Sequence, residues 1–143
     1  MNDGDGWVSG PEGQRWGRFG AAGLLLTRSD GHVLMQRRSF LVQNGGLWSI
    51  PGGARNSHET AAEAALREAA EECGVLSTAV RVVEERVLEY GWWSYTTVIA
   101  DAVAPFSPID SWEGESLWVA GEQVAELPLL PAFRATWAAL RAP

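Results

Sequence analysis

Apolar runs bounded by turn residues predict a series of short strands along the chain. Ser29, Asp30 and Gly31 separate the first two runs, so these two runs are expected to form a hairpin. Gly91 separates two later runs in the same way. The runs interpreted as strands cover residues 19–27, 32–37, 80–90, 92–103 and 117–119.

A helix is predicted from about residue 60 to residue 73. Thr60 and Glu63 fit a capping box, in which each side chain accepts a hydrogen bond from a backbone N–H group at the helix start. Gly74 suits the left-handed conformation that often follows a helix. Apolar residues recur at helical spacing and would dock this helix on a sheet: Ala62, Ala65, Leu66, Ala69 and Cys73.

Two weaker helical patterns cover residues 121–127 and 132–141. Strands mixed with two or three helices predict an α/β sandwich. Residues 18–143 are expected to form this single domain, because no repeat, low-complexity tract or linker interrupts them. Residues 1–17 are rich in glycine and are predicted to form an irregular arm, whose tryptophans pack on the domain or on a partner.

The net charge of −7 argues against binding to a polynucleotide, where Lys and Arg must replace the counterions of the phosphates. It allows a small phosphorylated ligand if a metal ion supplies positive charge. The one cysteine, Cys73, permits no intrachain disulfide, which fits a reducing compartment. The start of the chain lacks the pattern of a signal peptide, and the apolar run at residues 21–26 is too short to span a membrane. A cytoplasmic protein with no membrane partner is expected.

Three glutamates gather on one side of the predicted helix. At about 100° per residue, Glu68 and Glu72 share a face and Glu71 lies beside them. Like charges four residues apart destabilise a helix by about 0.2–0.5 kcal/mol per pair, and a bound cation reverses that effect. Hard oxygen ligands suit Mg²⁺. The alternative is a solvated acidic face, with Arg67 paired to Glu63.

The spacing within residues 53–75 decides between these interpretations. The segment matches, at every specified position, the pattern G-x5-E-x7-R-E-U-x-E-E-x-G-U, in which U is an apolar residue. This pattern is the Nudix box, and the chain therefore resembles the Nudix hydrolases. The preceding residues 47–53 and the layout of strands and helices are also similar to that family. The resemblance implies a Nudix-type α/β/α sandwich with a central mixed sheet.

The resemblance also implies roles for the residues of the box. Glu68, Glu71 and Glu72 would bind Mg²⁺, with Mn²⁺ as a substitute, and the backbone carbonyl of Gly53 would be a further ligand. Arg67 would hold the glutamates in place through its planar fork. The metal would neutralise phosphate oxygens and activate a water for attack on phosphorus.

Two acidic positions outside this cluster complete the expected site. Glu59 is expected to tie the loop to the helix. Family members often carry an acidic residue shortly before a tryptophan in a later strand, and Glu115, three residues before Trp118, is similar to it. Glu115 is therefore expected to reach the metal site, whereas Glu113 is not; the alternative for Glu115 is a solvated loop charge.

Other chemically active side chains are interpreted as structural. His32 and His58 lie outside any nucleophile–base pattern. Cys73 falls on the apolar stripe, so a packed thiol is favoured over the catalytic cysteine that isopentenyl diphosphate isomerases of the same fold require. In the predicted strand 92–103, Trp93 and Tyr95 share a face; packing is favoured there over stacking on a nucleobase.

The substrate is narrowed by elimination. Gly91 stands where ADP-ribose hydrolases carry a proline, and the extended motif of coenzyme A hydrolases is not evident. The expected activity is hydrolysis of a diphosphate linkage in a nucleoside triphosphate, as in MutT, with oxidised nucleotides among the candidates. The alternative is a non-catalytic Nudix-fold module that senses a nucleotide. Because many family members are dimers, a homodimer is expected.

Overall fold

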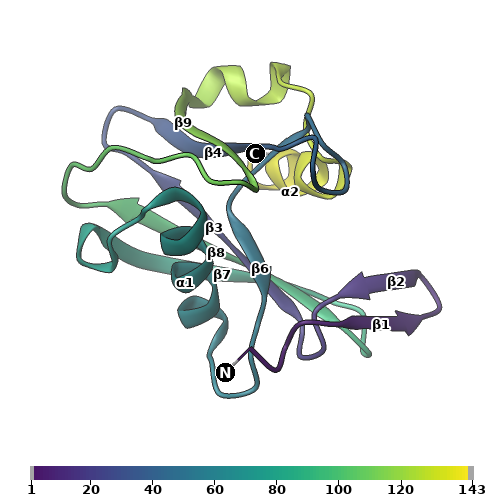
Figure 1. Cartoon of the computed structure of the whole chain (residues 1–143). Coiled ribbons are helices and arrows are strands. Elements are labelled where there is room, and N and C mark those ends of the chain that lie inside the picture. The colour runs from purple at the N-terminus through teal and green to yellow at the C-terminus, as the bar shows by residue number, and fades with distance from the viewer. Residues whose placement is uncertain (1, 142–143) are drawn as a thin grey trace.

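The computed structural model describes residues 2–141 of the chain (Figure 1). In chain order the elements are β1 (Trp7–Gly10), β2 (Gly13–Trp16), β3 (Ala21–Thr27), β4 (His32–Arg38), β5 (Trp48–Ser49), β6 (Gly52–Ala54), α1 (Ala61–Cys73), the 3-10 turn η1 (Ser77–Ala79), β7 (Val80–Glu89), β8 (Ser94–Ala102), β9 (Gly114–Ala120), the 3-10 helix η2 (Gly121–Glu126) and α2 (Pro131–Arg141).

The central sheet is mixed, as predicted. Its strands follow the order β5-β4-β3-β8-β7, with β6 paired to β3 and β9 paired to β4. Among the strands of residues 2–141, β3 and β8 form the parallel pair of this sheet, and the other pairs are antiparallel. Parallel pairing of β3 and β8 brings the strand that precedes the box beside a strand that follows it, which places α1 over the middle of the sheet.

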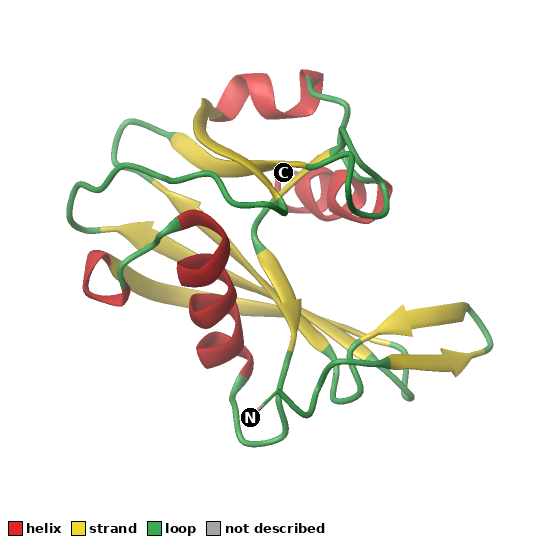
Figure 2. Ribbon diagram, in the orientation of Figure 1, coloured by secondary structure: helices red, strands yellow, loops and turns green. Residues whose placement is uncertain are grey.

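Helices cover the sheet from both sides, as Figure 2 shows for α1 and α2. Strand alternation sorts the core: Leu24 and Leu26 of β3 face α1, whereas Leu25 packs with Phe133 and Trp137 of α2. The face that α1 covers is lined by small side chains of the helix, which let it approach closely: Ala64, Ala65, Ala69 and Cys73. The α/β fold with helices on both faces is therefore confirmed.

The predicted hairpin between the first two strands is only partly formed. β3 and β4 share the turn, but the ladder between them is limited to the pair Thr27 and Val33. Beyond that point β6 pairs with residues Ala21 to Gly23 of β3, while β9 pairs along the whole of β4. The two strands therefore separate, and the gap admits the segment that leads into α1.

The caps of α1 are those predicted. The Thr60 side chain accepts a hydrogen bond from the Glu63 N–H at 3.1 Å, and the Glu63 carboxylate accepts one from the Thr60 N–H at 2.9 Å. Gly74 is left-handed, with φ of 72°, and its N–H group bonds to helix carbonyls. These caps fix where the helix starts and ends, and so which way its glutamates point.

The N-terminal segment is a β-hairpin rather than the irregular arm expected. Trp7 pairs with Trp16 across β1 and β2, and their rings meet edge to face with centroids 5.2 Å apart. Pro11 and Glu12 form the turn between the strands, a signal that a count of glycines alone does not reveal. In Figure 1 this hairpin projects beside the β7–β8 connection. Gly10 lies against the ring of Trp92, whose indole N–H donates to Glu12 at 2.6 Å.

Two later elements differ in detail from their predicted extents. β9 begins at Gly114, so it contains Glu115, which was expected in a loop. Trp92 and Trp93 lie in the turn before β8 rather than in the strand, because Tyr90 N–H bonds to the Trp93 carbonyl at 2.9 Å and closes that turn. Among residues 2–141, no helix is long and apolar enough to cross a membrane.

Candidate active site

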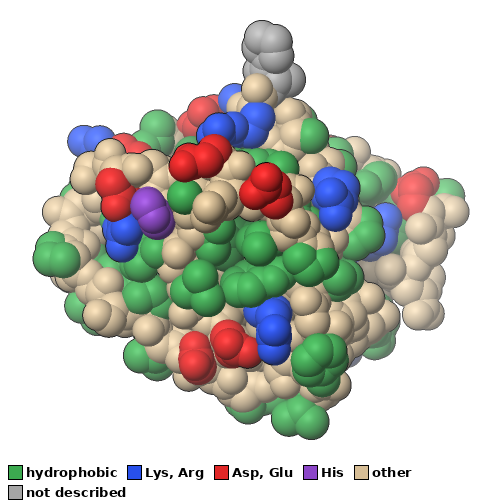
Figure 3. All heavy atoms as spheres, turned by 90° about the horizontal axis from the view of Figure 1, so that it is seen from above, with side chains coloured by type: hydrophobic (Ala, Val, Ile, Leu, Met, Phe, Trp, Pro, Cys, Tyr) green, Lys and Arg blue, Asp and Glu red, His purple; other side chains and the backbone are tan. Residues whose placement is uncertain are grey.

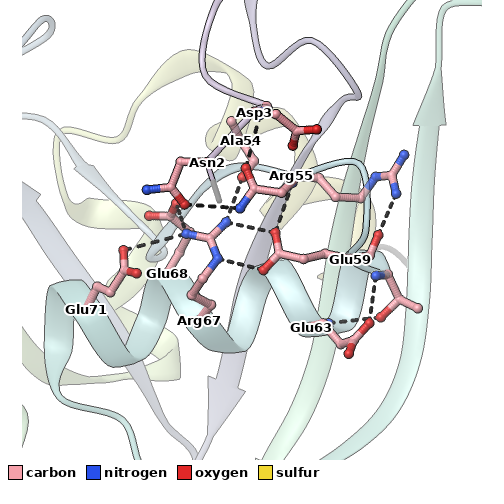
Figure 4. A network of polar contacts seen from close by, with 12 residues as sticks. Asn2, Asp3, Ala54, Arg55, Glu59, Glu63, Arg67, Glu68 and Glu71 are labelled. Atoms are coloured by element: carbon pink, nitrogen blue, oxygen red, sulfur yellow. Dashed lines mark hydrogen bonds and ion pairs between the residues drawn. The ribbon is translucent and has the colours of Figure 1, made fainter.

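Arg67 of α1 is the centre of a polar network that joins the helix to the loop before it (Figure 4). Its guanidinium grips the Glu59 carboxylate with two hydrogen bonds, Nε to Oε2 at 2.6 Å and Nη2 to Oε1 at 2.9 Å. Nη1 donates to Glu68 at 2.9 Å and lies 3.6 Å from Glu71. Nη2 also donates to the carbonyl of Ala54 at 3.0 Å.

Glu59 serves as the fixed end of this network. Its side chain is almost fully buried, and its Oε1 atom also accepts a hydrogen bond from the Asn56 N–H at 2.9 Å. Hydrogen bonds from Arg67 hold the pKa of the Glu59 carboxyl below its usual range. The hydrogen bond with Glu59, in turn, raises the pKa of Arg67. Both groups therefore stay charged, and the fork orients Glu68 from one side, as the box implies.

Glu68 lies directly against Gly53 of β6. A Cβ atom added at Gly53 would stand 2.6 Å from the Glu68 carboxyl carbon, so only glycine leaves room for this carboxylate. Burial raises the pKa of Glu68 to about 7, although the hydrogen bond from Arg67 lowers it. The structure thus brings together the carboxylate and the glycine that the box places fifteen residues apart.

Glu72 is the most buried of the three glutamates, with 3% of its surface exposed. Its Oε1 atom accepts a hydrogen bond from the Gly52 N–H at 3.1 Å. Burial, and then the charges of Glu68 and Glu113, raise the pKa of Glu72 to about 9. Glu71, by contrast, is more than half exposed and stands at the rim of the cluster.

The donor set fits a divalent cation. Within residues 2–141, no three His, Cys, Asp or Glu side chains are already gathered around one point, because Arg67 and the Gly52 N–H group engage Glu68 and Glu72. However, the oxygens of Glu68 and Glu72 are hard donors, and burial beside like charge disfavours their ionised forms. A cation between them would relieve that repulsion, as Mg²⁺ does in carboxylate sites.

The structure corrects the expected place of Glu115. Glu115 forms an ion pair with Arg37 of the neighbouring strand β4 at 3.0 Å, and its side chain is more than half exposed. The next residue, Ser116, is buried and donates to the Cys73 sulfur of α1 at 3.1 Å. Because side chains alternate along a strand, Ser116 faces α1 and Glu115 faces away from it.

Glu113, rather than Glu115, is the acidic residue of this segment whose charge acts on Glu72. It precedes β9, and it raises the pKa of the Glu72 carboxyl. The Glu113 carbonyl accepts a hydrogen bond from the Ser39 N–H at 2.8 Å, which fixes the loop beside the end of β4. The sequence signal was present in the Glu113-Gly114-Glu115 segment, but choosing between the two glutamates required the true start of the strand.

The comparisons with known proteins agree with this geometry. The family model of the NUDIX domain matches residues 17–140. The chain belongs to the Nudix family. A Mycobacterium tuberculosis (strain H37Rv) protein named "Putative 8-oxo-dGTP diphosphatase 3" is 46% identical over 97% of this chain and 70% of its own length. A Bifidobacterium longum "Nucleoside triphosphate pyrophosphatase/Nudix hydrolase fusion protein" is 38% identical over 94% of this chain and 30% of its own length.

A solved structure of similar sequence supports the assignment. The Nudix hydrolase RenU from Mycobacterium smegmatis is 45% identical and superposes with a TM-score of 0.87, over 96% of this chain and 93% of RenU. The chain is therefore a Nudix hydrolase, and an enzyme rather than a non-catalytic module of the same fold. Nudix hydrolases generally use a divalent metal ion, which is consistent with the donor set formed by the glutamates.

The N-terminus of this Nudix hydrolase holds the loop before α1, a contact that sequence reasoning missed. The Gly4 N–H donates to the Asn56 side chain at 3.0 Å, and the Asn56 amide donates to Asn2 at 3.2 Å. Asp3 accepts hydrogen bonds from the backbone and hydroxyl of Ser57. We call residues 2–4 the N-terminal clasp. Since Asn56 also bonds Glu59, the clasp reaches the Arg67 network in two steps.

Three aromatic rings of the Nudix hydrolase form a continuous row. Trp93 lies between Tyr95 and Tyr90, with ring centroids 6.3 Å and 6.1 Å away, and Arg15 of β2 stacks on Trp93 and Tyr90. The hydroxyl of Tyr95 lies 2.1 Å from where a Cβ atom of Gly23 would stand. Burial raises the pKa of Tyr95, and the charge of Glu72 raises it further. The row thus begins near the glutamates and runs toward the N-terminal hairpin.

Cys73 is the packed thiol that the sequence predicts. Cys73 is fully buried, and burial raises the pKa of its thiol to about 12, so it is no nucleophile at neutral pH. His32 lies beside Asp30 in the β3–β4 turn, and His58 is exposed in the loop before α1.

A hollow of about 380 Å³ lies between η2 and α2, away from the glutamates of α1. Its lining includes Ala125, Leu129 and Trp137. Figure 3, the view from above, shows hydrophobic side chains along the middle of a face with acidic and basic groups on both sides. The carboxylates and the aromatic row, rather than this hollow, carry groups suited to diphosphate chemistry.

Proposed function

We propose that this Nudix hydrolase hydrolyses a diphosphate linkage of a nucleoside triphosphate, releasing pyrophosphate, with Mg²⁺ as its metal and Mn²⁺ as a substitute. The observation that carries the proposal is the pair of partly buried Glu68 and buried Glu72, held between Arg67 and the glycines of β6. Two carboxylates with raised pKa values accommodate an anionic polyphosphate only if a cation lies between them and the phosphates.

Each residue of the site has a definable task in this reaction. Arg67, fixed by Glu59, sets the orientation of Glu68. Gly53 leaves the space that the Glu68 carboxylate occupies. The bound metal would neutralise phosphate oxygens and lower the pKa of a water that attacks phosphorus. One of the glutamates, for which we propose Glu72, would accept a proton from that water.

Two findings favour an oxidised purine triphosphate among the substrates. The Mycobacterium tuberculosis relative is named for 8-oxo-dGTP. The row of Tyr95, Trp93 and Tyr90 starts near Glu72, and aromatic side chains of this kind bind a base by stacking. A cytoplasmic location is proposed on the grounds that Cys73 is a free thiol.

A substrate panel tests the proposal. Ordinary and 8-oxo-purine triphosphates, ADP-ribose, sugar nucleotides and dinucleoside polyphosphates are incubated with enzyme and Mg²⁺, and the products are separated by ion-exchange chromatography. We expect the triphosphates to yield pyrophosphate, the oxidised ones with the highest kcat/KM, and excess EDTA to stop the reaction. Preferred turnover of ADP-ribose, or full activity in EDTA, would refute it.

A variant pair connects this activity to the glutamates. Glu72→Gln keeps the side-chain volume but removes a charged ligand, so turnover should fall by at least about 1,000-fold. The control is Glu126→Gln, an exposed position of η2, which should leave turnover unchanged. Wild-type turnover of Glu72→Gln at saturating Mg²⁺ would show that α1 does not carry the metal site.

A further inference from the structure

β7 is an edge strand with an unusually open surface. In the sheet order it stands last, and within residues 2–141 it pairs with β8 alone. Residues 81–89 are all exposed, since neither α1 nor α2 extends over this strand. Its apolar members are far from covered: Val83 is 57% exposed, Val87 is 60% exposed and Leu88 is 54% exposed. The outer backbone edge and three apolar side chains are therefore free to meet another strand.

The order of side chains along β7 is complementary to itself. Around Glu85 the sequence reads Val83-Glu84-Glu85-Arg86-Val87. If a second copy of β7 lies antiparallel, with a twofold axis at Glu85, Glu84 of each copy stands opposite Arg86 of the other, and Val83 stands opposite Val87. Opposite charges and apolar pairs in facing positions both stabilise a sheet. The cost of this register is a single contact between the two Glu85 side chains.

The pairing of β7 with β8 shows that Glu84 and Arg86 lie on the same face of the sheet. Glu84 lies opposite Ile99 and Arg86 opposite Thr97, so both project to the side of the sheet that α2 covers. They already form an ion pair within the strand at 3.0 Å. Across the twofold axis, two glutamates and two arginines would therefore form one ring of alternating charge on that side.

Neighbouring registers lack this complementarity. A twofold axis at Glu84 sets Val83 against Glu85 and brings two Glu84 side chains together. An axis at Arg86 sets Glu85 against Val87 and brings two guanidinium groups together. Val83 is the residue that β8 leaves unpaired, between Val82 and Glu84, so the irregularity falls at the outermost position of the complementary segment and spares Glu84, Glu85 and Arg86.

We propose that a second copy of this chain binds along β7, so that the two sheets join into one across a twofold axis at Glu85. The inference does not depend on the proposed reaction, because β7 carries none of the residues placed in the active site. An edge that only needed protection from aggregation would be served by charges of one sign. Here the charges alternate in the order that a second copy matches.

Charge reversal tests the register. Molar mass is measured by light scattering after size exclusion, and the dissociation constant by analytical ultracentrifugation. We expect the wild type to be a dimer at high concentration. Arg86→Glu alone, and Glu84→Arg alone, should each weaken self-association by on the order of tenfold or more, because both facing pairs become repulsive. An equimolar mixture of these two variants should form a one-to-one dimer, since each then supplies the charges that the other lacks.

Two further variants separate the interface from damage to the fold. The double variant E84R/R86E exchanges the charges and should dimerise like the wild type. Glu85→Thr removes the one repulsive contact and should tighten the dimer. Circular dichroism and nucleotide hydrolysis should be unchanged in all four variants. A wild type that stays monomeric at about 200 µM, where even a weak dimer would be populated, or a dimer indifferent to both single reversals, would overturn the proposal.

Discussion

A single guanidinium organises the catalytic helix at the residue scale. Arg67 connects Glu59 in the loop, the carbonyl of Ala54 in β6 and Glu68 in the helix. The acceptors of its hydrogen bonds lie on three segments, which must keep fixed relative positions for the glutamates to face one point. A lysine in the same place would keep the charge but could not hold three acceptors in one plane.

Replacement of Arg67 by lysine keeps the positive charge but removes the planar guanidinium, so it tests whether the geometry of that group matters. Arg67→Lys should lower kcat by about 100-fold or more, and reduce the free energy of unfolding by about 1–3 kcal/mol, because the buried carboxylate of Glu59 loses a bidentate partner. Urea unfolding and steady-state kinetics measure the two effects. Arg28→Lys, at an exposed ion pair with Asp30, is the matched control and should change neither. An Arg67→Lys enzyme with normal kcat would leave Arg67 without a positioning role.

The two glutamates around Gly114 give a second test at this scale. Glu113→Gln should lower kcat by about 10- to 1,000-fold with a smaller change in KM, because its carboxylate acts beside Glu72. Glu115→Gln should stay within about twofold of the wild type, because it loses only an exposed ion pair with Arg37. The reverse result, with Glu115 critical and Glu113 silent, would show that the loop rearranges when substrate binds.

The position of α1 along the sheet is set at the scale of elements. Thr60 and Glu63 define its first turn, and Gly74 defines its end, so the glutamates in between have little freedom to rotate about the helix axis. The last turn of α1 has no basic residue to offset the helix dipole, so its end depends on the glycine cap.

Removal of the cap at the start of α1 should reduce the stability of the protein. Thr60→Ala should reduce the free energy of unfolding by about 0.5–2 kcal/mol, and Thr60→Ser, which keeps the hydroxyl acceptor, should restore most of it. Thermal or urea unfolding measures the difference. Equal stability of the Ala and Ser variants would show that the cap contributes nothing measurable.

Prediction from sequence succeeded where a local rule decides the outcome. The caps of α1, the left-handed Gly74 and the packed thiol of Cys73 all follow from residue types at fixed spacing. It failed for Glu115, because the alternation of side chains depends on where β9 begins, and that start depends on pairing with β4. The N-terminal clasp could not be predicted either, since Asn2 and Asn56 are distant in sequence and meet only in the folded chain.

At the scale of the whole molecule, the sheet separates the glutamates of α1 from the hydrophobic core under α2. The face under α1 carries the buried glutamates, whereas the face under α2 is closed by aromatic and aliphatic side chains such as Phe133 and Trp137. A cluster of buried negative charge on one face weakens the folded state until a cation neutralises it. We therefore expect metal binding and folding to be coupled in this protein.

Melting curves should show this coupling. Mg²⁺ at 100 times its dissociation constant should stabilise the folded state by about 2.7 kcal/mol relative to EDTA, and so raise Tm by several degrees. Glu72→Gln should lose most of that shift, because a charged ligand is gone. Scanning calorimetry with matched ionic strength measures both. An identical Tm with Mg²⁺ and with EDTA would indicate that the glutamates bind no metal in the absence of substrate.

The N-terminal clasp has a practical consequence for anyone who prepares this enzyme. Asn2 and Gly4 touch Asn56, and Asn56 leads through Glu59 to the guanidinium that orients the glutamates. Residues exchanged at Asn2 or Gly4 when the protein is prepared would therefore disturb the loop that leads to the active site. Rate constants measured on such material would report on the clasp as well as on the glutamates.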